Sequence, residues 1–533
     1  MCGICGAFEF AGRGAVDEPA VRAMLDSIVH RGPDEEGIFA DGDVGFGTRR
    51  LSIIDLEGAS QPLMNEDASI VVAFNGEIYN FRELQDGLRS RGHSLRSEGD
   101  GEVIAHLYEE LGVRCVEELD GMFAFAVWDK RARHLLIARD RLGIKPLYYA
   151  AGPDRLVFGS EIKALLRYTG VSPRLDVTAL GHFLALKYVP SPRTMFGGIA
   201  SLPPGHVLEC TERGVAVSRY WDVSFARPSV RRSEGEYVEE LGEHLRRAVG
   251  SQLVSDVPFG AFLSGGVDSS TIVALMSGFL DQPVKTFAVG FEGAGASASE
   301  LPFARMVAER YGTDHHEVLV TPSDLMRLAK KVVWHLDQPI ADNACLPNYI
   351  VASLASQHVK MVLTGEGGDE LFAGYARYAG ERFAPAFGRL PASARRAVLG
   401  LSSRLPLLRR PKLALYALSQ TDDVRRLVNW FPLFNTEMLE QLSAGELARA
   451  VEESPAEAVF AEQLGGADGP DALSRMLYVD TKLWLPDDLL ARGDKMSMAA
   501  SLEARVPLLD HRLVEFAATV PPNLKVRRFT RKY

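Results

Sequence analysis

The residues whose types could do chemistry begin at the second position of the chain. The sequence opens Met-Cys-Gly-Ile-Cys, and removal of Met1, which a small second residue permits, leaves Cys2 with a free α-amine beside its thiol. An amine with a pKa of about 8 next to a thiol with a pKa of about 8.5 is a self-contained base and nucleophile. The N-terminus therefore predicts an acyl-transfer site built on Cys2.

Cys2 and Cys5 also have the spacing of a redox pair or of half a zinc site. A redox pair normally lies at a helix N-terminus, and a zinc knuckle needs a second Cys or His pair, which the sequence does not offer nearby. The residues from Ile4 to Phe10 alternate in the period of a half-buried strand, so Cys2 and Cys5 are expected to face opposite ways. The pattern favours one nucleophilic cysteine over metal or redox use.

Polar residues in the first 100 positions match the needs of such a site. The Asn75 side chain and the Gly76 N–H are suitable donors for an oxyanion. A zwitterionic substrate such as glutamine needs a cation for its α-carboxylate and an anion for its α-amine, and Arg50 and Asp100 carry those charges. Asn-Gly is also the commonest hairpin turn, so this pair is informative only together with the N-terminal cysteine.

The strongest signal lies in the second half, where Ser264-Gly265-Gly266-Val267-Asp268-Ser269-Ser270 stands between an apolar strand and a helix. Two glycines let the backbone approach a ligand closely, and N–H groups at a helix start attract an anion, so a phosphate is the expected guest. The loop lacks the lysine of a Walker A motif. The alternative is a tight strand-to-helix turn capped by Ser and Asp.

A second loop, Thr364-Gly365-Glu366-Gly367-Gly368-Asp369-Glu370, follows another expected strand. In an open α/β sheet both loops lie at the carboxyl ends of strands, where ligands bind. Asp268 and Asp369 are therefore expected to hold Mg²⁺ on phosphate oxygens, and Glu366 to accept a proton. Lys495 is a candidate for the positive charge that a transferring phosphoryl group needs.

The elements that must position these residues divide the chain into two parts. The first 225 residues or so are rich in short strands, among them 69–74, 121–128, 134–138 and 155–158, interrupted by helices near 20–29 and 101–111, which predicts an α+β region. The stretch 224–236 has the composition of a linker.

Beyond residue 236 strands alternate with helices, which predicts a parallel, doubly wound sheet. The expected helices are 237–253, 269–280, 301–311 and 323–336, and the expected strands are 257–263, 284–291, 315–320 and 359–363. From 377 to 480 the sequence reads as helical and carries no recognisable motif.

Composition sets the remaining bounds. A chain of 533 residues predicts two or more domains, and 47% hydrophobic with 24% charged residues is typical of soluble globular proteins. No secretory signal or apolar run of membrane-spanning length is present, and five scattered cysteines fit reduced thiols, so we expect a cytoplasmic location. A net charge of −11 argues against nucleic-acid and anionic-membrane partners. The basic tail 525–532 is expected to be a solvated, incompletely folded end.

Taken together, these motifs resemble those of glutamine-hydrolysing asparagine synthetases. The resemblance runs in the family's order over nearly the whole length, through Cys2-Gly-Ile, His30-Arg-Gly-Pro-Asp34, Arg50-Leu-Ser-Ile53, Asn75-Gly-Glu-Ile-Tyr-Asn80, Arg139-Asp140, Gly143–Tyr148, Ser264–Ser270, Gly365–Glu370 and Glu503-Ala-Arg-Val-Pro507.

The resemblance implies an N-terminal-nucleophile glutaminase domain (αββα sandwich, 2–225) that feeds ammonia through a tunnel to an ATP-pyrophosphatase-type domain with extra helices (236–533). It implies that Cys2 attacks glutamine, that Asn75 and Gly76 form the oxyanion hole, and that Glu366 and Lys495 act at an acyl-adenylate. The other implied roles are glutamine binding (Arg50, Ile53, Glu77 and Asp100), ATP binding (Ser264, Gly265, Gly266, Asp268, Ser269, Ser270, Val289, Gly290 and Gly365) and Mg²⁺ binding (Asp268 and Asp369).

The implied reaction is ATP-dependent synthesis of asparagine from aspartate and glutamine, with β-aspartyl-AMP as the intermediate. Two alternatives stay open: an amidotransferase of the same architecture that acts on another carboxylate, in cell-surface sugar or secondary-metabolite biosynthesis, and a catalytically silent protein that binds glutamine or nucleotide. Family members usually continue beyond a Lys-Tyr pair like Lys532-Tyr533, so we expect the second domain to be truncated there. The oligomeric state is not readable, and a homodimer is one candidate.

Overall fold

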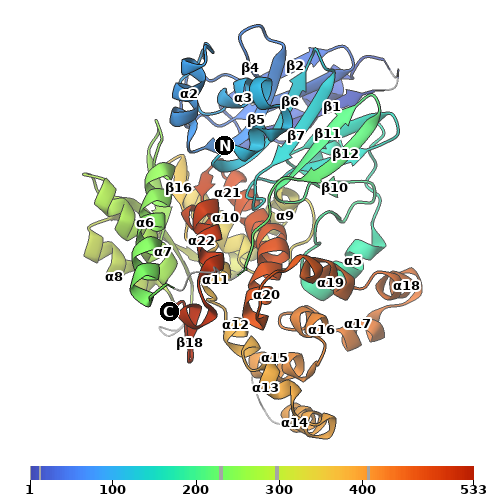
Figure 1. Ribbon diagram of the computed structural model, residues 1–533, viewed down its shortest axis with the longest axis vertical. Coiled ribbons are helices and arrows are strands. Elements are labelled where there is room, and N and C mark those ends of the chain that lie inside the picture. Colours follow the sequence, from blue (N-terminus) through green and yellow to red (C-terminus); the bar gives the residue numbers. More distant parts are fainter. Residues whose placement is uncertain (1, 11, 13, 227–231, 294–298, 405–408) are drawn as a thin grey trace.

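The computed structural model describes residues 2–10, 12, 14–226, 232–293, 299–404 and 409–533. It shows two regions in contact, a sheet-rich one in blue to green and a helix-rich one in green to red (Figure 1). The predicted linker 224–236 falls partly outside the described residues, and a helix already begins within it at Glu234.

The sheet-rich region contains two six-stranded antiparallel sheets. The first has the strand order β10-β8-β9-β1-β3-β2 and the second has the order β12-β11-β7-β6-β5-β4. The strands of the first sheet are β1 (Cys2–Glu9), β2 (Glu35–Asp41), β3 (Val44–Arg50), β8 (Tyr148–Ala151), β9 (Arg155–Gly159) and β10 (Ala200–Ser201). Those of the second are β4 (Leu63–Met64), β5 (Ile70–Ile78), β6 (Gly121–Asp129), β7 (His134–Arg139), β11 (His206–Thr211) and β12 (Gly214–Arg219).

An apolar core that includes Phe8, Phe46 and Trp128 joins the two sheets. Helix α1 (Glu18–Ser27) packs on the outer face of the first sheet, and α3 (Val103–Leu111), with α2 (Phe81–Ser90) beside it, packs on the second. The predicted αββα sandwich is therefore confirmed. The short helices η1 (Val29–Arg31), η2 (Gly112–Glu117), α4 (Ile162–Leu165) and α5 (Val177–Leu186) complete the region.

One local prediction for this region was wrong, and one alternative interpretation is excluded. Strand β1 is buried along its whole length rather than half-buried, because α1 covers the face that would otherwise meet solvent. Asn75 and Gly76 do not form a hairpin turn, because β5 runs straight through them to Ile78. The missing side chain of Gly76 has a packing reason, since a Cβ there would lie 2.1 Å from the Met122 carbonyl oxygen on β6.

The helix-rich region is built on a five-stranded parallel sheet of order β15-β14-β13-β16-β17. Its strands are β13 (Phe259–Phe262), β14 (Lys285–Phe291), β15 (Asp314–Val320), β16 (Met361–Leu363) and β17 (Glu503–Arg505). The chain winds outward from β13 in one direction and then returns to place β16 on its other side. The predicted doubly wound sheet is thus confirmed, and its switch point lies between β13 and β16.

Helices surround this sheet (Figure 1). Those of the alternating part are α6 (Glu234–Gln252), α7 (Val267–Phe279), α8 (Leu301–Tyr311), α9 (Pro322–Leu336) and α10 (Cys345–Ala355). The segment 377–480, which was predicted to be helical, forms α12 (Ala376–Glu381), α13 (Ala384–Gly388), α14 (Ala392–Arg404), α15 (Arg409–Ser419), α16 (Asp423–Val428), α17 (Thr436–Leu442), α18 (Gly445–Glu453), α19 (Ala456–Gly466) and α20 (Ala472–Val479).

The last part of the chain returns to the sheet. It contains η3 (Asp480–Leu490), α21 (Ala491–Met498), η4 (Pro507–Leu509), α22 (His511–Thr519) and α23 (Pro522–Lys525), whereas α11 (Gly368–Phe372) directly follows β16. The basic tail was predicted to be solvated and incompletely folded. Residues 527–531 are exposed as predicted, but the prediction of an incompletely folded end is wrong. The tail forms the hairpin β18 (Val526–Arg527) and β19 (Thr530–Arg531), and the side chain of Lys525 is buried.

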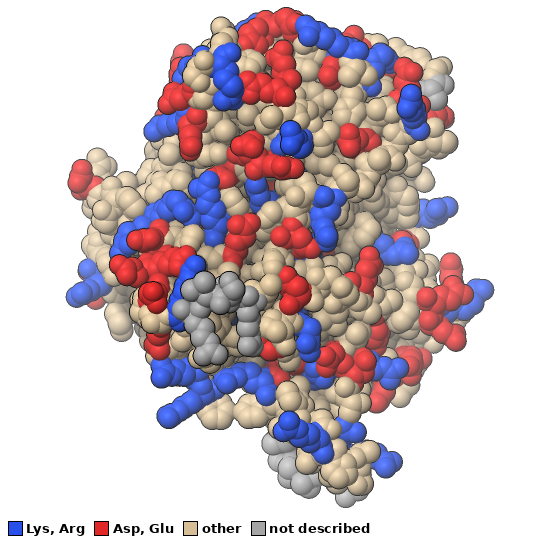
Figure 2. All heavy atoms as spheres, in the orientation of Figure 1, with Lys and Arg blue, Asp and Glu red and all other residues tan. Residues whose placement is uncertain are grey.

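On the face drawn in Figure 2, acidic and basic side chains are interspersed over both regions. Among the described residues, no helix combines the length and the apolar character that crossing a membrane requires.

Candidate functional sites

Cys2 is held at the junction of the two stacked sheets. It begins β1, opposite Arg50 of β3, and its thiol is almost fully buried. Its backbone nitrogen donates to Asn75 Oδ1 at 3.0 Å, across the gap to β5. Burial raises the pKa of the Cys2 thiol, so the thiolate must be generated by a nearby base. The side chain of Met1 and its removal lie outside the described residues.

The other end of the Asn75 amide is free to act. Asn75 has no exposed surface, and its Nδ2 has no hydrogen-bond partner among the described residues. The Gln61 side chain also lies near the thiol, and its Nε2 donates to Cys2 Sγ at 3.7 Å. A buried amide N–H without a partner is costly, and here it stands beside a nucleophile, as a donor for an oxyanion would.

Arg50 is placed close to Cys2 but its guanidinium already has acceptors. Its terminal nitrogens donate to the carbonyl oxygens of residues 54–56 at 2.7 to 3.2 Å and pair with Glu35 at 3.1 Å. Ile53 is buried in the same loop, and its carbonyl oxygen accepts from the Asp256 N–H at 2.9 Å. Arg50 therefore fixes the loop that borders the thiol, and its role toward a substrate carboxylate stays a prediction.

Glu77 and Asp100 lie side by side at the end of β5. The Asp100 carboxylate accepts from the Ile78 N–H at 2.8 Å, and burial raises its pKa to about 6. Glu77 pairs at 3.0 Å with Arg505, which comes from β17 in the other region. Burial also raises the pKa of Glu77, with a further rise from the neighbouring Glu503 carboxylate. Glu77 and Asp100, which were predicted to bind glutamine, thus lie at the contact between the two regions.

The predicted phosphate loop joins β13 to α7 at the switch point. Gly265 has a positive φ of 77°, and a Cβ there would lie 2.5 Å from the backbone nitrogen of Ala304, so only glycine fits. Gly266 caps α7, and Asp268 lies in its first turn. The hydroxyls of Ser264 and Ser269 are 3.0 Å apart and close the loop.

The second loop, between β16 and α11, packs directly on the first. A Cβ on Gly365 would lie 2.7 Å from the Ser269 nitrogen, and one on Gly368 would lie 2.7 Å from Asp268 Oδ1. Glycine at both positions lets the two loops touch. Val289 and Gly290 lie on the neighbouring β14, where Leu301 of α8 closes over the Gly290 backbone.

Asp268 and Asp369 converge on one cation, and that cation is Lys532. The ammonium of Lys532 contacts Asp268 Oδ2 and lies 2.8 Å from Asp369 Oδ1. Two hard carboxylate oxygens that meet at one point suit Mg²⁺, so the residues fit the predicted ion. Lys532 stands where that ion would bind and has to move or share the site. Lys532 was not predicted as a site residue, because the tail was expected to be a solvated, incompletely folded end.

Lys495 lies on α21, and its role toward a phosphoryl group stays a prediction. Its buried ammonium donates to the Leu336 carbonyl oxygen at 2.7 Å and to Asp337 at 2.8 Å. The basic group near Glu366 is instead Arg492, at 3.4 Å. Lys495 follows Arg492 by three residues on α21, but the contacts of the two side chains show that they face different partners. Burial raises the pKa of Glu366, which suits a proton acceptor.

The same helix α21 links the two sites. Arg31, which is fully buried, donates to the Cys2 carbonyl oxygen at 3.2 Å and pairs with Asp494 at 2.8 Å. Asp494 lies between Arg492 and Lys495, so one turn of α21 contacts Glu366 through Arg492 and reaches the Cys2 strand indirectly, through Arg31. No local sequence pattern indicated this pairing, because Arg31 and Asp494 are 463 residues apart.

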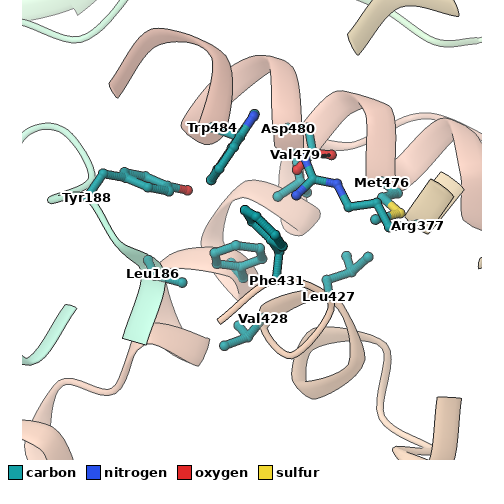
Figure 3. A pocket seen from close by; sticks show the side chains of 11 residues that line it. Leu186, Tyr188, Arg377, Leu427, Val428, Phe431, Met476, Val479, Asp480 and Trp484 are labelled. Atoms are coloured by element: carbon teal, nitrogen blue, oxygen red, sulfur yellow. Dashed lines mark hydrogen bonds and ion pairs between the residues drawn. The ribbon is translucent and has the colours of Figure 1, made fainter. Parts of the chain in front are cut away.

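A small cavity lies where the two regions meet near α5 and η3 (Figure 3). The guanidinium of Arg377 lies near the rings of Phe431 and Trp484, with ring centroids at 5.9 and 5.0 Å, and pairs with Asp480 at 3.0 Å. The cavity measures about 30 Å³, which is room for about one or two water molecules. It is a packed junction rather than a substrate pocket.

The chain was compared with known protein families and curated proteins. The asparagine synthase family matches residues 240–533, and the glutamine amidotransferase domain matches residues 1–221. The chain is 36% identical to asparagine synthetase [glutamine-hydrolyzing] 1 of Bacillus subtilis, over 100% of this chain and 83% of that protein. It is 37% identical to a putative asparagine synthetase of Mycobacterium bovis, over 100% of this chain and 84% of the other. It is also 30% identical to amidase chyE of Penicillium rubens, over 99% and 83%.

Proposed function

Because the chain belongs to the family of glutamine-hydrolysing asparagine synthetases, we propose that it makes asparagine from aspartate. The family assignment makes it a ligase that uses ATP and takes its amide nitrogen from glutamine. We place the glutaminase domain at residues 2–225 and the synthetase domain at 236–533. The observation that supports the first half-reaction best is the free Nδ2 of Asn75 beside Cys2.

In the proposed glutaminase step, the Cys2 thiol gives its proton to its own α-amine and Sγ attacks the glutamine amide carbon. Asn75 Oδ1 holds the amine, while Asn75 Nδ2 and the Gly76 N–H stabilise the oxyanion. The proton passes to the leaving ammonia, and water then hydrolyses the thioester to glutamate and restores the thiol. Glu77 and Asp100 bind the substrate ammonium, and Arg50 its carboxylate. Glu77 must exchange its contact with Arg505 for that role.

In the proposed synthetase step, the loop Ser264–Ser270 and Gly365 bind the ATP phosphates, and Val289 and Gly290 border the adenine. The aspartate β-carboxylate attacks the α-phosphate, which releases pyrophosphate and leaves β-aspartyl-AMP. Ammonia from Cys2 passes through an internal tunnel and displaces AMP, with Glu366 accepting the proton. Asp268 and Asp369 would hold Mg²⁺, which would neutralise phosphate charge. Lys532 is then free to contact the pyrophosphate.

An amidation of another carboxylate is the second candidate. The chain is also similar to a protein named amidase chyE, which supports this candidate. The sequence motifs do not identify the residues that would select the carboxylate acceptor. A silent binding protein is the third, and the presence of Cys2, Asp268, Glu366 and Asp369 disfavours it.

One assay separates the three candidates. The full chain is incubated with MgATP, glutamine and aspartate as the sole carboxylate acceptor, and pyrophosphate and asparagine are measured together. Equal amounts of both products are expected. Glutamate formation without aspartate-dependent pyrophosphate would exclude aspartate as the acceptor, and absence of both activities would support a binding protein.

A further inference from the structure

A cluster of histidine and glutamate side chains lies at the edge of the glutaminase-type region, away from Cys2. It consists of Glu66 between β4 and β5, His93 after α2, and His106 and Glu109 on α3. Helices α2 and α3 and strand β4 adjoin one another at the upper left of Figure 1. One ligand atom from each of the four residues lies within 4.8 Å of all the others. We call these four residues the His-Glu cluster.

The two imidazoles face each other through the same ring nitrogen. His93 Nδ1 and His106 Nδ1 are 3.2 Å apart. The Glu66 carboxylate spans both, with Oε1 at 3.1 Å from His93 Nδ1 and Oε2 at 3.3 Å from His106 Nδ1. Two ring nitrogens and the two oxygens of one carboxylate, from three separate segments, therefore lie close together.

The opposite ring nitrogens face other carboxylates. His93 Nε2 lies 3.1 Å from Glu110 Oε1, and His106 Nε2 lies 3.5 Å from Glu102 Oε1. A neutral histidine that donates its Nε2–H to a carboxylate leaves a lone pair on Nδ1. Two such lone pairs at 3.2 Å repel each other unless a metal ion or a proton stands between them. A carboxylate on the far nitrogen is also the usual outer contact of a metal-binding histidine.

The spacing matches a tetrahedral coordination shell. Ligand atoms at 2.0 to 2.2 Å from a zinc ion are about 3.3 to 3.6 Å apart along the edges of the tetrahedron. The distance between the two Nδ1 atoms, 3.2 Å, and the distances from each of them to the nearer oxygen of Glu66, 3.1 and 3.3 Å, are close to that range. Glu109, one helical turn after His106, is the candidate fourth ligand, and its carboxylate is oriented by Asn65 Nδ2 at 3.0 Å.

We propose that Glu66, His93, His106 and Glu109 form a binding site for a divalent transition-metal ion of the zinc class. Imidazole nitrogens favour such ions over Mg²⁺, which prefers oxygen ligands alone. The bound ion joins α3 to the segment between α2 and α3. That segment also carries Asp100, so the metal stiffens the frame of the glutamine site without touching substrate.

The experiment uses the full chain in a Cys2→Ala background, because the Cys2 thiol would itself bind the metal. The protein is stripped with a chelator and titrated with Zn²⁺ by calorimetry in the presence of excess Mg²⁺. We expect one tight equivalent and a higher melting temperature. Glu66→Gln keeps the shape and the acceptor for the Ser94 N–H but loses the charge, and we expect it to weaken binding at least about tenfold.

His93→Gln is expected to act like Glu66→Gln, and both residues are partly exposed, so these variants should fold even if a His106 variant does not. His134→Gln is the matched control, since His134 is a histidine of the same region that pairs with Tyr108 and Glu209 and not with the cluster. The control should bind zinc normally. No tight equivalent in the parent, or equal binding by all four proteins, would overturn the site and leave a hydrogen-bonded pair in which one histidine is protonated.

Discussion

The two candidate active sites differ in how completely the folded chain assembles them. Around Cys2, the paired strands β1 and β3 and the strand β5 across the core bring Asn75 Oδ1 to 3.0 Å from the Cys2 nitrogen, and Asn75 Nδ2 has no hydrogen-bond partner among the described residues. Around Asp268, two loops meet, but a lysine from the C-terminal hairpin occupies the point where a metal ion is expected.

The difference follows from the elements that carry the groups. A strand inside a hydrogen-bonded ladder has one register, so the side chains of Cys2 and Asn75 have fixed positions. Loops at the carboxyl ends of strands are set by glycine contacts and can still accept different cations. A single substitution in the glutaminase site is therefore expected to abolish glutamine hydrolysis, whereas a single substitution in the synthetase site is expected to reduce ATP-dependent activity only in part.

The largest expected effect comes from Cys2→Ala. Loss of the nucleophile should lower glutamine hydrolysis by ~10⁴-fold or more, as measured by glutamate release. Synthesis from free ammonium salt should persist, because the ATP loops lie in the other region. Cys5→Ala is the control, since Cys5 is buried against α1 on the opposite face of β1 and should keep most activity. Glutaminase activity retained by Cys2→Ala would refute the N-terminal nucleophile.

Asp268→Asn and Asp369→Asn come next. A carboxamide keeps the shape but loses the charge that Mg²⁺ needs, so ATP-dependent pyrophosphate release should fall about 10²- to 10³-fold with a raised Mg²⁺ requirement. Glutamine hydrolysis should be unchanged. If both variants turned over ATP normally, the two aspartates would be turn residues and nothing more.

Lys532→Met tests whether the hairpin lysine belongs to the synthetase site. Removing its charge should lower pyrophosphate release about 10- to 100-fold, the range for loss of one charge-stabilising group. Arg528→Met is the matched control, because Arg528 is exposed on the same hairpin. Equal effects of the two substitutions would show that Lys532 acts only through the stability of the tail.

The smallest effect is a pH dependence of glutamine binding. Burial raises the pKa of Asp100 to about 6, and the hydrogen bond from the Ile78 N–H opposes part of that rise. Below pH 6 the carboxyl becomes neutral and loses its attraction for the substrate ammonium. The KM for glutamine should then rise by up to about tenfold per pH unit as the pH falls, with little change above pH 7. In Asp100→Asn the KM should be high and flat, and a persisting pH slope would assign the titration to another group.

Local sequence patterns predicted much of the fold of this protein. Alternating apolar residues predicted the strands around Cys2, and the alternation of strands and helices predicted the parallel sheet with its two ligand loops, because hydrophobic periodicity follows the geometry of each element. Gly265 and Gly266 predicted close approach of a ligand to the backbone, and the structure shows that Gly265 packs against the Ala304 nitrogen and Gly365 against the Ser269 nitrogen.

Only the tertiary structure decided which charges meet. Lys495 was predicted to act on a phosphoryl group, but its ammonium pairs with Asp337. Lys532, from the tail that carried no predicted site residue, pairs with Asp268 and Asp369. Arg31 and Asp494, Glu77 and Arg505, and the two histidines of the His-Glu cluster are likewise brought together by the fold. Sequence spacing fixes neighbours within one helix or strand, but ion pairs between distant segments depend on how whole elements pack, and no local pattern encodes that.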